Sequence, residues 1–420
     1  MACRSERTRE VAVAYELMHA VNAALDGVCI NSLSAGVEWR DVYRMALSHS
    51  LDAASWFAVR DASDMDARIR AAWERRMQLA SFRSVRMAVE RDAIFAQLES
   101  AGIAYLPLRG ARIAACYPHP EMRTMSDVDF LYGYVEERPK GGFRLTGATE
   151  MEQALSLERA MLAVRDIAVA RGYRIENLRG GHHDSYYKEP CYNLEPHRTL
   201  FVSSSPFSSY YANPWRLAHR EQPGSYRFVM DASDEYIYFI AHAHKHVMGP
   251  GMGLRLLADT RVLLRERGRY MDEAYIAREL DELGIRQFER TLRSIAERLA
   301  TGEHLSAEEE ELFAYLAHSG SYGTIENYVF RQIERVAGGA EDGEGQESAA
   351  SVSASRLRAR YLANRLSVFL ADHASAEQQF PRLSRYRVTA PILAVVRVSR
   401  QLVRSRKKLI KELKVLLSYR

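Results

Sequence analysis

Hydrophobic residues recur every three or four positions over residues 8–100, as in VAVAYELMHAVNAAL and SVRMAVERDAIFAQLE. This spacing places apolar side chains on one face of a helix, so it predicts a helical N-terminal region. The same pattern returns from Ser233 onward, in SDEYIYFIAHAHKHV and GLRLLADTRVLLRERG. We expect helices in both regions, and no strand after Ser233.

The segment between these regions follows a different pattern. Short apolar runs bounded by glycine or proline predict strands, and they read AGIAYLPLRG, DVDFLY, GYRIENL, DSYYKE and CYNLEPHRTLF. ARIAACYP predicts a brief helix that stops at Pro118, and residues 151–171 predict a longer helix. The pattern predicts the α+β class, with a small mixed β-sheet core flanked by N-terminal and C-terminal helical regions.

Changes in pattern and composition divide the chain into five expected segments. Residues 337–355, AGGAEDGEGQESAASVSAS, are small, polar and acidic, and this composition is typical of a flexible linker. The expected segments are an N-terminal helical region (1–95), an α/β core (96–230), a helical region packing on the core (231–336), the linker (337–356) and a C-terminal helical region with a basic tail (357–420).

Composition narrows the class of protein. The chain has 420 residues, of which 47% are hydrophobic and 27% charged, so it is too apolar for a disordered protein and long enough for more than one core. The four cysteines form no CxxC pair and favour neither a disulfide framework nor a zinc knuckle. The charged N-terminus lacks an apolar run, and no stretch approaches the length of a membrane span. These features predict a cytoplasmic protein without a transmembrane segment.

The C-terminal end, RVSRQLVRSRKKLIKELKVLLSYR, carries nine basic residues and a single acidic one, Glu412. The formal net charge of the whole chain is only +4, so net charge alone does not indicate nucleic-acid binding. The local cluster does suggest an anionic partner, either RNA or a membrane surface, contacted through Lys407, Lys408 and Lys411. The alternative is a helix that packs by its Leu and Val residues and leaves its basic face in water.

Two aspartates stand one residue apart in RTMSDVDFLY. On a strand, Asp127 and Asp129 would project from one face, roughly 6.5–7 Å apart along the chain. Ionised carboxylates placed in this way repel each other unless they are well solvated or share a cation. Mg²⁺ or Mn²⁺ prefers such oxygen ligands. The alternative is a solvated strand start, where Ser126 and Asp127 merely close the preceding loop.

The longer stretch LPLRGARIAACYPHPEMRTMSDVDFLY resembles the signature of the uncharacterised nucleotidyltransferase family, which belongs to the polymerase-β-like nucleotidyltransferase superfamily. That signature has Leu-Lys-Gly, a short helix ending near Tyr-Pro, an Arg, and an Asp-x-Asp on a strand. Arg109 stands where the family has lysine, which keeps the charge but replaces a point ammonium with a planar fork. The matching residues are Leu108, Gly110, Tyr117, Pro118, Arg123, Ser126, Asp127 and Asp129.

The resemblance also implies a third acidic residue on a neighbouring strand, within a Glu-x-His pair. YNLEPHRTL supplies Glu195 and His197, which share one strand face. Pro196 between them predicts an edge strand or a strand end, because proline cannot donate to a central ladder. Without the resemblance, Glu195 could equally be a solvated residue and His197 a packed edge residue.

The implied function is a metal-dependent nucleotidyltransferase that moves an NMP group from a nucleoside triphosphate, such as ATP, to an unidentified hydroxyl acceptor. The resemblance assigns catalysis and the binding of Mg²⁺ or Mn²⁺ to Asp127, Asp129 and Glu195. It assigns nucleotide and phosphate binding to Arg109, Gly110, Arg123 and Ser126, with Gly110 at the start of a short helix.

Histidines cluster in two further places. His242 and His246 are four residues apart and share a helix face, where we expect them to line the cleft together with His197. A zinc site is not expected there, because HExxH and a third clustered ligand are absent from that segment. The loop RGGHH, which contains His182 and His183, is given no role, because tandem glycines in a hairpin need no function.

Two rival functions remain open. Fold does not fix function, so the chain could be a catalytically inactive binding or regulatory protein that keeps the nucleotidyltransferase scaffold. It could also be an RNA or membrane-surface binder that acts through its basic C-terminal helix. The sequence selects neither the nucleotide nor the acceptor.

Overall fold

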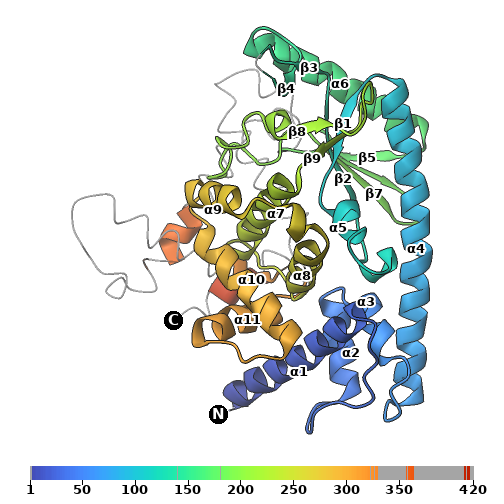
Figure 1. The fold of residues 1–420 in the computed structure, drawn as a ribbon, viewed down its shortest axis with the longest axis vertical. Coiled ribbons are helices and arrows are strands. Elements are labelled where there is room, and N and C mark those ends of the chain that lie inside the picture. Colours follow the sequence, from blue (N-terminus) through green and yellow to red (C-terminus); the bar gives the residue numbers. More distant parts are fainter. Residues whose placement is uncertain are drawn as a thin grey trace. The chain divides into compact units, whose positions relative to one another are not determined.

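The computed structural model, drawn in Figure 1, describes residues 2–139, 141–179, 181–321, 323–325, 327–329, 356, 358–363, 411, 412 and 414–416. The chain forms two compact units. The first contains residues 1–244 and 253–321, and the second groups 245–252 with the residues from 322 onward.

The N-terminal region of the first unit is helical, as its periodicity predicts. It contains α1 (Ala2–Leu25), α2 (Trp39–Ser48), α3 (Asp52–Val59) and α4 (Ala67–Ser100). The longest of these, α4, begins where the Asp66 side chain accepts hydrogen bonds from the N–H groups of Arg68 and Ile69.

A five-stranded mixed sheet follows, and its strands are the five that the apolar runs predict. They are β1 (Ala104–Pro107), β2 (Val128–Gly133), β5 (Arg174–Asn177), β6 (Ser185–Lys188) and β7 (Tyr192–His197). The spatial order is β1-β2-β7-β6-β5, and only β2 and β7 are parallel. The short helix α5 (Gly110–Ala114) and a 3-10 turn (Pro120–Met122) connect β1 to β2.

Two helices cover one face of this sheet, as Figure 1 shows for α4 beside β5 and β7. The second is α6 (Glu150–Ala170), which begins with a capping box formed by Thr149 and Glu152. Alternate residues of β2 and β7 face these helices, including Phe130, Tyr132 and Leu194, and all three are at most 1% exposed. The intervening residues therefore project from the opposite face.

Two short hairpins were not predicted from the sequence. They are β3 (Val135–Glu137) with β4 (Phe143–Leu145), and β8 (Ala218–Arg220) with β9 (Phe228–Met230), which follows a 3-10 turn (Pro214–Leu217). Three-residue strands are too short to produce a recognisable alternation of apolar and polar positions. The second hairpin reaches the edge of the main sheet, where the Tyr105 N–H donates to the Tyr226 carbonyl.

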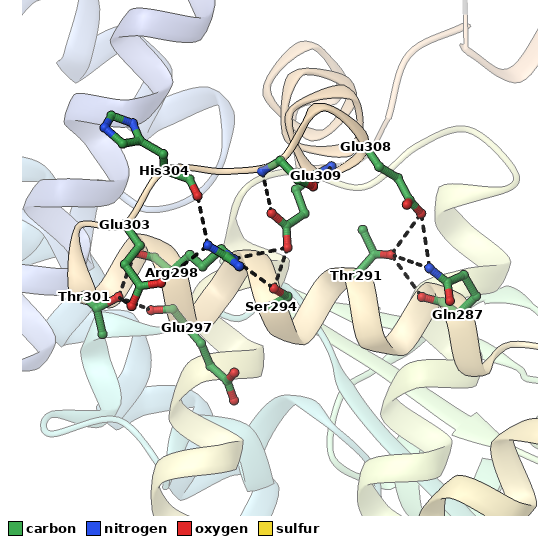
Figure 2. A network of polar contacts seen from close by, with 11 residues as sticks. Gln287, Thr291, Ser294, Glu297, Arg298, Thr301, Glu303, His304, Glu308 and Glu309 are labelled. Atoms are coloured by element: carbon green, nitrogen blue, oxygen red, sulfur yellow. Dashed lines mark hydrogen bonds and ion pairs between the residues drawn. The ribbon is translucent and has the colours of Figure 1, made fainter.

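After Met230, the described residues are helical and contain no strand, as expected. The elements are α7 (Ala232–Val247), α8 (Arg255–Arg267), a 3-10 turn (Gly268–Tyr270), α9 (Glu273–Glu282), α10 (Arg286–Thr301) and α11 (Ala307–Ser319). Figure 2 shows the polar network between α10 and α11. In it, Arg298 donates to Ser294, and Ser294 in turn donates to Glu309. The sequence and the structure thus agree on an α+β protein with a small mixed sheet flanked by helices.

The described residues of the second unit form a small apolar cluster of Val329, Tyr361, Val415 and Leu416. The Tyr361 hydroxyl donates to Glu412, while Lys411 and Lys414 are exposed. Val415 and Leu416, near the end of the basic tail, are therefore buried in this cluster. The expected linker, 337–356, lies outside the described residues except for Arg356.

Among the helices that the structure describes, none combines the length and the apolar character needed to cross a membrane.

Candidate active site

Acidic side chains from two neighbouring strands meet on the face of the sheet that α4 and α6 leave uncovered. Asp129 of β2 lies directly opposite Glu195 of β7 in the parallel register, and Leu131 lies opposite His197. Asp127 immediately precedes β2. The strand pairing thus brings together carboxylates that are more than sixty residues apart in the sequence.

Asp129 is the most enclosed of these carboxylates, with a side chain only 8% exposed. Its Oδ1 lies 3.2 Å from Nε2 of His197, and its Oδ2 accepts from Nη2 of Arg109 at 3.3 Å. The other arm of the same guanidinium, Nη1, lies 2.8 Å from Nδ1 of His242. The planar fork of Arg109 therefore contacts two partners at once, which a lysine ammonium reaches less readily.

The pKa values of the three carboxyl groups are shifted in different directions. Burial and the nearby charges of Asp129 and Asp127 raise the pKa of Glu195 to about 7. Burial and Asp129 also raise the pKa of Asp127, although the Ser126 hydroxyl hydrogen-bonds to it. Burial would raise the pKa of Asp129 as well, but the His197 hydrogen bond and the charges of His197 and Arg109 lower it to about 2. The site therefore concentrates more negative charge than its own side chains neutralise.

Pro196 does not mark an edge strand, which corrects one expectation. β7 is the central strand of the sheet, and Pro196 pairs with Phe130 on β2. The other half of the expectation is confirmed, because Pro196 is the last residue but one of β7. The regular pairs with β6 end at Leu194, and the Pro196 carbonyl accepts from the Asp184 N–H beyond them. Proline has no N–H group to donate, and here it lies beyond the last regular pair between β6 and β7, where no hydrogen bond of the regular ladder is lost.

Arg123, an expected phosphate-binding residue, contacts a buried aspartate of α8. Its Nε and Nη2 donate to the two carboxylate oxygens of Asp259 at 2.8 and 3.0 Å. Tyr117 also donates to Asp259, at 2.8 Å, and Nη1 of Arg123 donates to the Gly110 carbonyl at 3.3 Å. Two residues of the family signature, Tyr117 and Arg123, thus contact one buried carboxylate, and Arg123 connects it to a third, Gly110.

The two remaining phosphate-binding candidates border the site differently. Gly110 begins the five-residue helix α5, and a Cβ added there would meet the Met125 sulfur at an ordinary contact distance of 3.5 Å. Ser126 is exposed, and its hydroxyl contacts Asp127. Both residues lie within one or two positions of a residue of the acidic site.

Two histidines at this site were given no role from the sequence. The rings of His182 and His183 lie 5.1 and 5.0 Å from the ring of His197, between ring centres. Nε2 of His183 also lies 3.6 Å from Oε2 of Glu195. Sequence spacing gives no signal for this cluster, because it depends on how the loop before β6 folds against the end of β7.

The two helix histidines that were expected to line the cleft, His242 and His246, belong to different units. His242 is buried and contacts Arg109, so it does lie beside the acidic residues. His246, one turn further on, belongs to segment 245–252, which groups with the second unit. His244 between them packs on the rings of Phe207 and Phe288.

Paired acidic strands on a small mixed sheet are the arrangement expected of a nucleotidyltransferase. The family model described as "Uncharacterised nucleotidyltransferase" matches residues 35–136 and 155–301. The chain belongs to the uncharacterised nucleotidyltransferase family, and this membership supports a general role in nucleotidyl transfer. The comparisons with curated proteins and with solved structures gave no match.

Proposed function

We propose that the protein is a metal-dependent nucleotidyltransferase that moves an NMP group from a nucleoside triphosphate, such as ATP, to an acceptor hydroxyl. The observation that carries this proposal is the register of β2 and β7, which places Asp129 opposite Glu195 with Asp127 next to the start of β2. This geometry requires a parallel pairing of two strands distant in sequence, and a solvated strand start would not need it.

The residues at the site fit a hard divalent cation. One ligand atom each from Asp129, Glu195 and His197 lies within 4.8 Å of the others. The raised pKa of Glu195, caused by burial and by the neighbouring carboxylates, is the behaviour of acid groups that lack a balancing positive charge. Asp127, Asp129 and Glu195 would hold Mg²⁺ or Mn²⁺. When bound, such an ion neutralises triphosphate oxygens and favours departure of pyrophosphate.

The chain's own cations would orient the nucleotide. Arg109, held between Asp129 and His242, places a guanidinium beside the carboxylates, where it would neutralise charge on phosphate oxygens. Arg123 acts through Gly110, because its contact with the Gly110 carbonyl holds the turn that carries Arg109. Ser126, exposed beside Asp127, would contact phosphate at the mouth of the site.

The first test is metal-dependent nucleotide binding. Mg²⁺ or Mn²⁺ and each nucleoside triphosphate are titrated into the full-length wild type and into Asp127→Asn/Asp129→Asn. We expect the double variant to lose on the order of 100-fold or more in affinity, since two metal ligands are removed. Asp166→Asn is the matched control, because Asp166 is 67% exposed and its ion pair is with the neighbouring Arg165. Equal binding by the wild type and the double variant would contradict the proposal.

The second test separates nucleotidyl transfer from phosphoryl transfer. The protein is incubated with a cell extract and a nucleoside triphosphate labelled on either the α- or the γ-phosphate. Attack on the α-phosphorus moves the α-label to the acceptor and releases the γ-label in pyrophosphate. Transfer of the γ-label to an acceptor would overturn the assignment. The identity of the labelled molecule then defines the acceptor.

A second candidate is a nucleotide-binding protein without transfer activity. The observation that favours it is the contact of both Asp129 oxygens, which Arg109 and His197 occupy in this structure. A metal ion would have to compete with these partners for the carboxylate. Nucleotide binding that depends on Asp127 and Asp129, without transfer of either label in any extract, would support this candidate over the enzyme.

A further inference from the structure

Three imidazoles meet beside the carboxylates, on the side formed by the loop before β6. One ring nitrogen of each of His182, His183 and His197 lies within 4.8 Å of the others. The centres of the rings of His182 and His183 are 4.7 Å apart. The cluster lies next to the carboxylate centre and shares one residue, His197, with it.

Buried contacts hold the loop that carries two of these histidines. Asp184, which is 0% exposed, accepts a hydrogen bond from the Arg179 N–H at 2.6 Å. It also forms an ion pair with Arg198. Arg198 also donates to the Gly181 carbonyl at 2.9 Å, and its backbone N–H donates to the His182 carbonyl at 2.8 Å. The positions of the imidazoles thus follow from several fixed contacts between the loop and the end of β7.

A carboxylate hydrogen-bonds to one of the rings, that of His197, and a second carboxylate lies near His183. Nε2 of His197 lies 3.2 Å from Asp129, and Nε2 of His183 lies 3.6 Å from Glu195. Nδ1 of His197 is buried and has no hydrogen-bond partner among the residues that the structure describes. A carboxylate on one nitrogen of an imidazole fixes its tautomer and leaves the other nitrogen as a metal ligand, which is the usual surrounding of a metal-binding histidine.

We propose that His182, His183 and His197 bind a divalent transition-metal ion, with Zn²⁺ as the best fit. This site goes beyond the proposed transfer reaction, whose hard cation would be bound by carboxylate oxygens. Neutral imidazole suits Zn²⁺ far better than Mg²⁺, which selects oxygen ligands. The fourth position of a tetrahedral ion would be open to water.

The required rearrangement is small. Nitrogens around a tetrahedral zinc ion lie roughly 3.4 Å apart, from bonds of about 2.1 Å. The ring nitrogens already lie within 4.8 Å of each other, so side-chain rotations suffice to close the site. The two loop histidines are only partly buried, so an ion can reach them from solvent.

The test uses Co²⁺ as a spectroscopic substitute for zinc in the full-length, metal-free protein. Co²⁺ on three imidazoles gives visible absorption bands, which Zn²⁺ added in competition should remove. We expect His182→Gln/His183→Gln to weaken Co²⁺ binding by on the order of 100-fold or more, since removing even an outer partner of a metal-bound histidine costs about 10–100-fold. The matched control is His304→Gln, because His304 is exposed and belongs to the loop between α10 and α11. It should bind Co²⁺ as the wild type does.

Two further variants keep this proposal separate from the proposed function. Asp127→Asn should lose Mg²⁺-dependent nucleotide binding but keep the Co²⁺ bands, and His182→Gln/His183→Gln should show the reverse. Failure of all nucleotide binding would remove the proposed function and leave the cobalt result valid. Absence of the bands in the wild type, or equal bands in the double histidine variant, would overturn the zinc site. Loss of the bands in Asp127→Asn alone would also overturn it, because the ion would then belong to the carboxylates.

Discussion

Glu195 lies opposite Asp129 and near Asp127, so its charge opposes folding in the metal-free protein. Its pKa is raised from 4.5 to about 7 by burial and by these carboxylates. A raised carboxyl pKa means that the unfavourable free energy is fully present above pH 7 and disappears as the pH falls towards 4.5. We expect Glu195→Gln to raise the free energy of unfolding by roughly 1–3 kcal/mol at pH 8 in the presence of a chelator.

Denaturant unfolding of both proteins at pH 8 and pH 5 measures this effect. The difference between them should shrink at pH 5, and added Mg²⁺ should stabilise the wild type more than the variant. Glu176→Gln is the control, because Glu176 is exposed on β5 and should change stability by less than about 0.5 kcal/mol. If the wild type is more stable than Glu195→Gln in the presence of chelator, the charge of Glu195 does not oppose folding, and the prediction is wrong.

Substitution of Arg109 can separate the effect of its charge from the effect of its two contacts. Its guanidinium contacts Asp129 and His242 with different arms, so Arg109→Lys keeps the charge but loses one of the two contacts. We expect Arg109→Lys to weaken metal-dependent nucleotide binding by about tenfold, and Arg109→Met to weaken it further, because a charge-assisted contact is worth about 1.5–3 kcal/mol. Isothermal titration with the nucleotide and Mg²⁺ measures both. Tighter binding by Arg109→Met would show instead that Arg109 competes with the metal for Asp129.

At the scale of elements, the pair of Arg123 and Asp259 connects the turn before β2 to α8. The two side chains are 9% and 1% exposed, and the contact is bidentate. Removing one partner of a buried ion pair leaves an uncompensated charge, so Asp259→Asn should lower the free energy of unfolding by about 3–5 kcal/mol. Asp61→Asn is the control, since its pair with Arg60 is exposed and worth no more than about 1 kcal/mol. A change below 1 kcal/mol in thermal or denaturant unfolding of Asp259→Asn would contradict this role.

His49, at the end of α2, connects this helix to two other elements. Its Nδ1 accepts from the Leu254 N–H before α8 at 3.0 Å, and its Nε2 donates to the Ala317 carbonyl of α11 at 3.1 Å. Burial lowers the pKa of His49 from 6.5 to about 4, so its contribution is complete above pH 6.5 and is lost as the pH falls towards 4. The loss should reach about 3 kcal/mol over this range.

Unfolding measured from pH 7 to pH 4 tests this dependence. His49→Gln should be less stable than the wild type at pH 7 and should lose less of its stability on acidification, because the titrating group is absent. His219→Gln, which removes a half-exposed histidine next to Asp231, should keep the slope of the wild type. Parallel pH profiles for wild type and His49→Gln would show that other groups cause the acid sensitivity.

The elements that the sequence predicts well are those with a strong local pattern. Tyr105, Phe130 and Leu194 belong to the buried cluster between the sheet, α4 and α6. Burial requires apolar side chains at these positions, so the strands are visible in the sequence as apolar runs. Asp127 and Asp129 were proposed as a pair from their spacing, but only Asp129 lies on β2, which begins at Val128. The partner of Arg123 was not predictable in this way, because Asp259 is 136 residues away along the chain. The histidine cluster depends on the register at the end of β7, where Pro196 makes the local pattern misleading.

At the scale of the whole molecule, the chemistry and the basic tail belong to different units. Except for His246, the candidate site residues lie in the first unit, and so do both segments matched by the family model apart from residues 245–252. The basic residues after 397 belong to the second unit. Charge changes in the tail should therefore alter binding to an anionic partner without altering the bound nucleotide.

The last prediction tests that separation with Lys407→Gln/Lys408→Gln/Lys411→Gln. These substitutions keep the apolar residues Val415 and Leu416, which are buried in the second unit, so the packing of the tail is retained. Each lysine near an anionic surface contributes about 1 kcal/mol, so three removed charges should weaken binding to RNA or anionic vesicles by on the order of 100-fold at low salt. Wild-type binding should also fall steeply as salt is added, while metal-dependent nucleotide binding stays equal in both proteins. If the wild type does not bind RNA or anionic vesicles at low salt, or if the three substitutions leave its binding unchanged, the basic residues of the tail do not form an anion-binding surface. The tail would then contribute only the packing of its apolar residues, because a basic surface that binds no polyanion has no electrostatic partner.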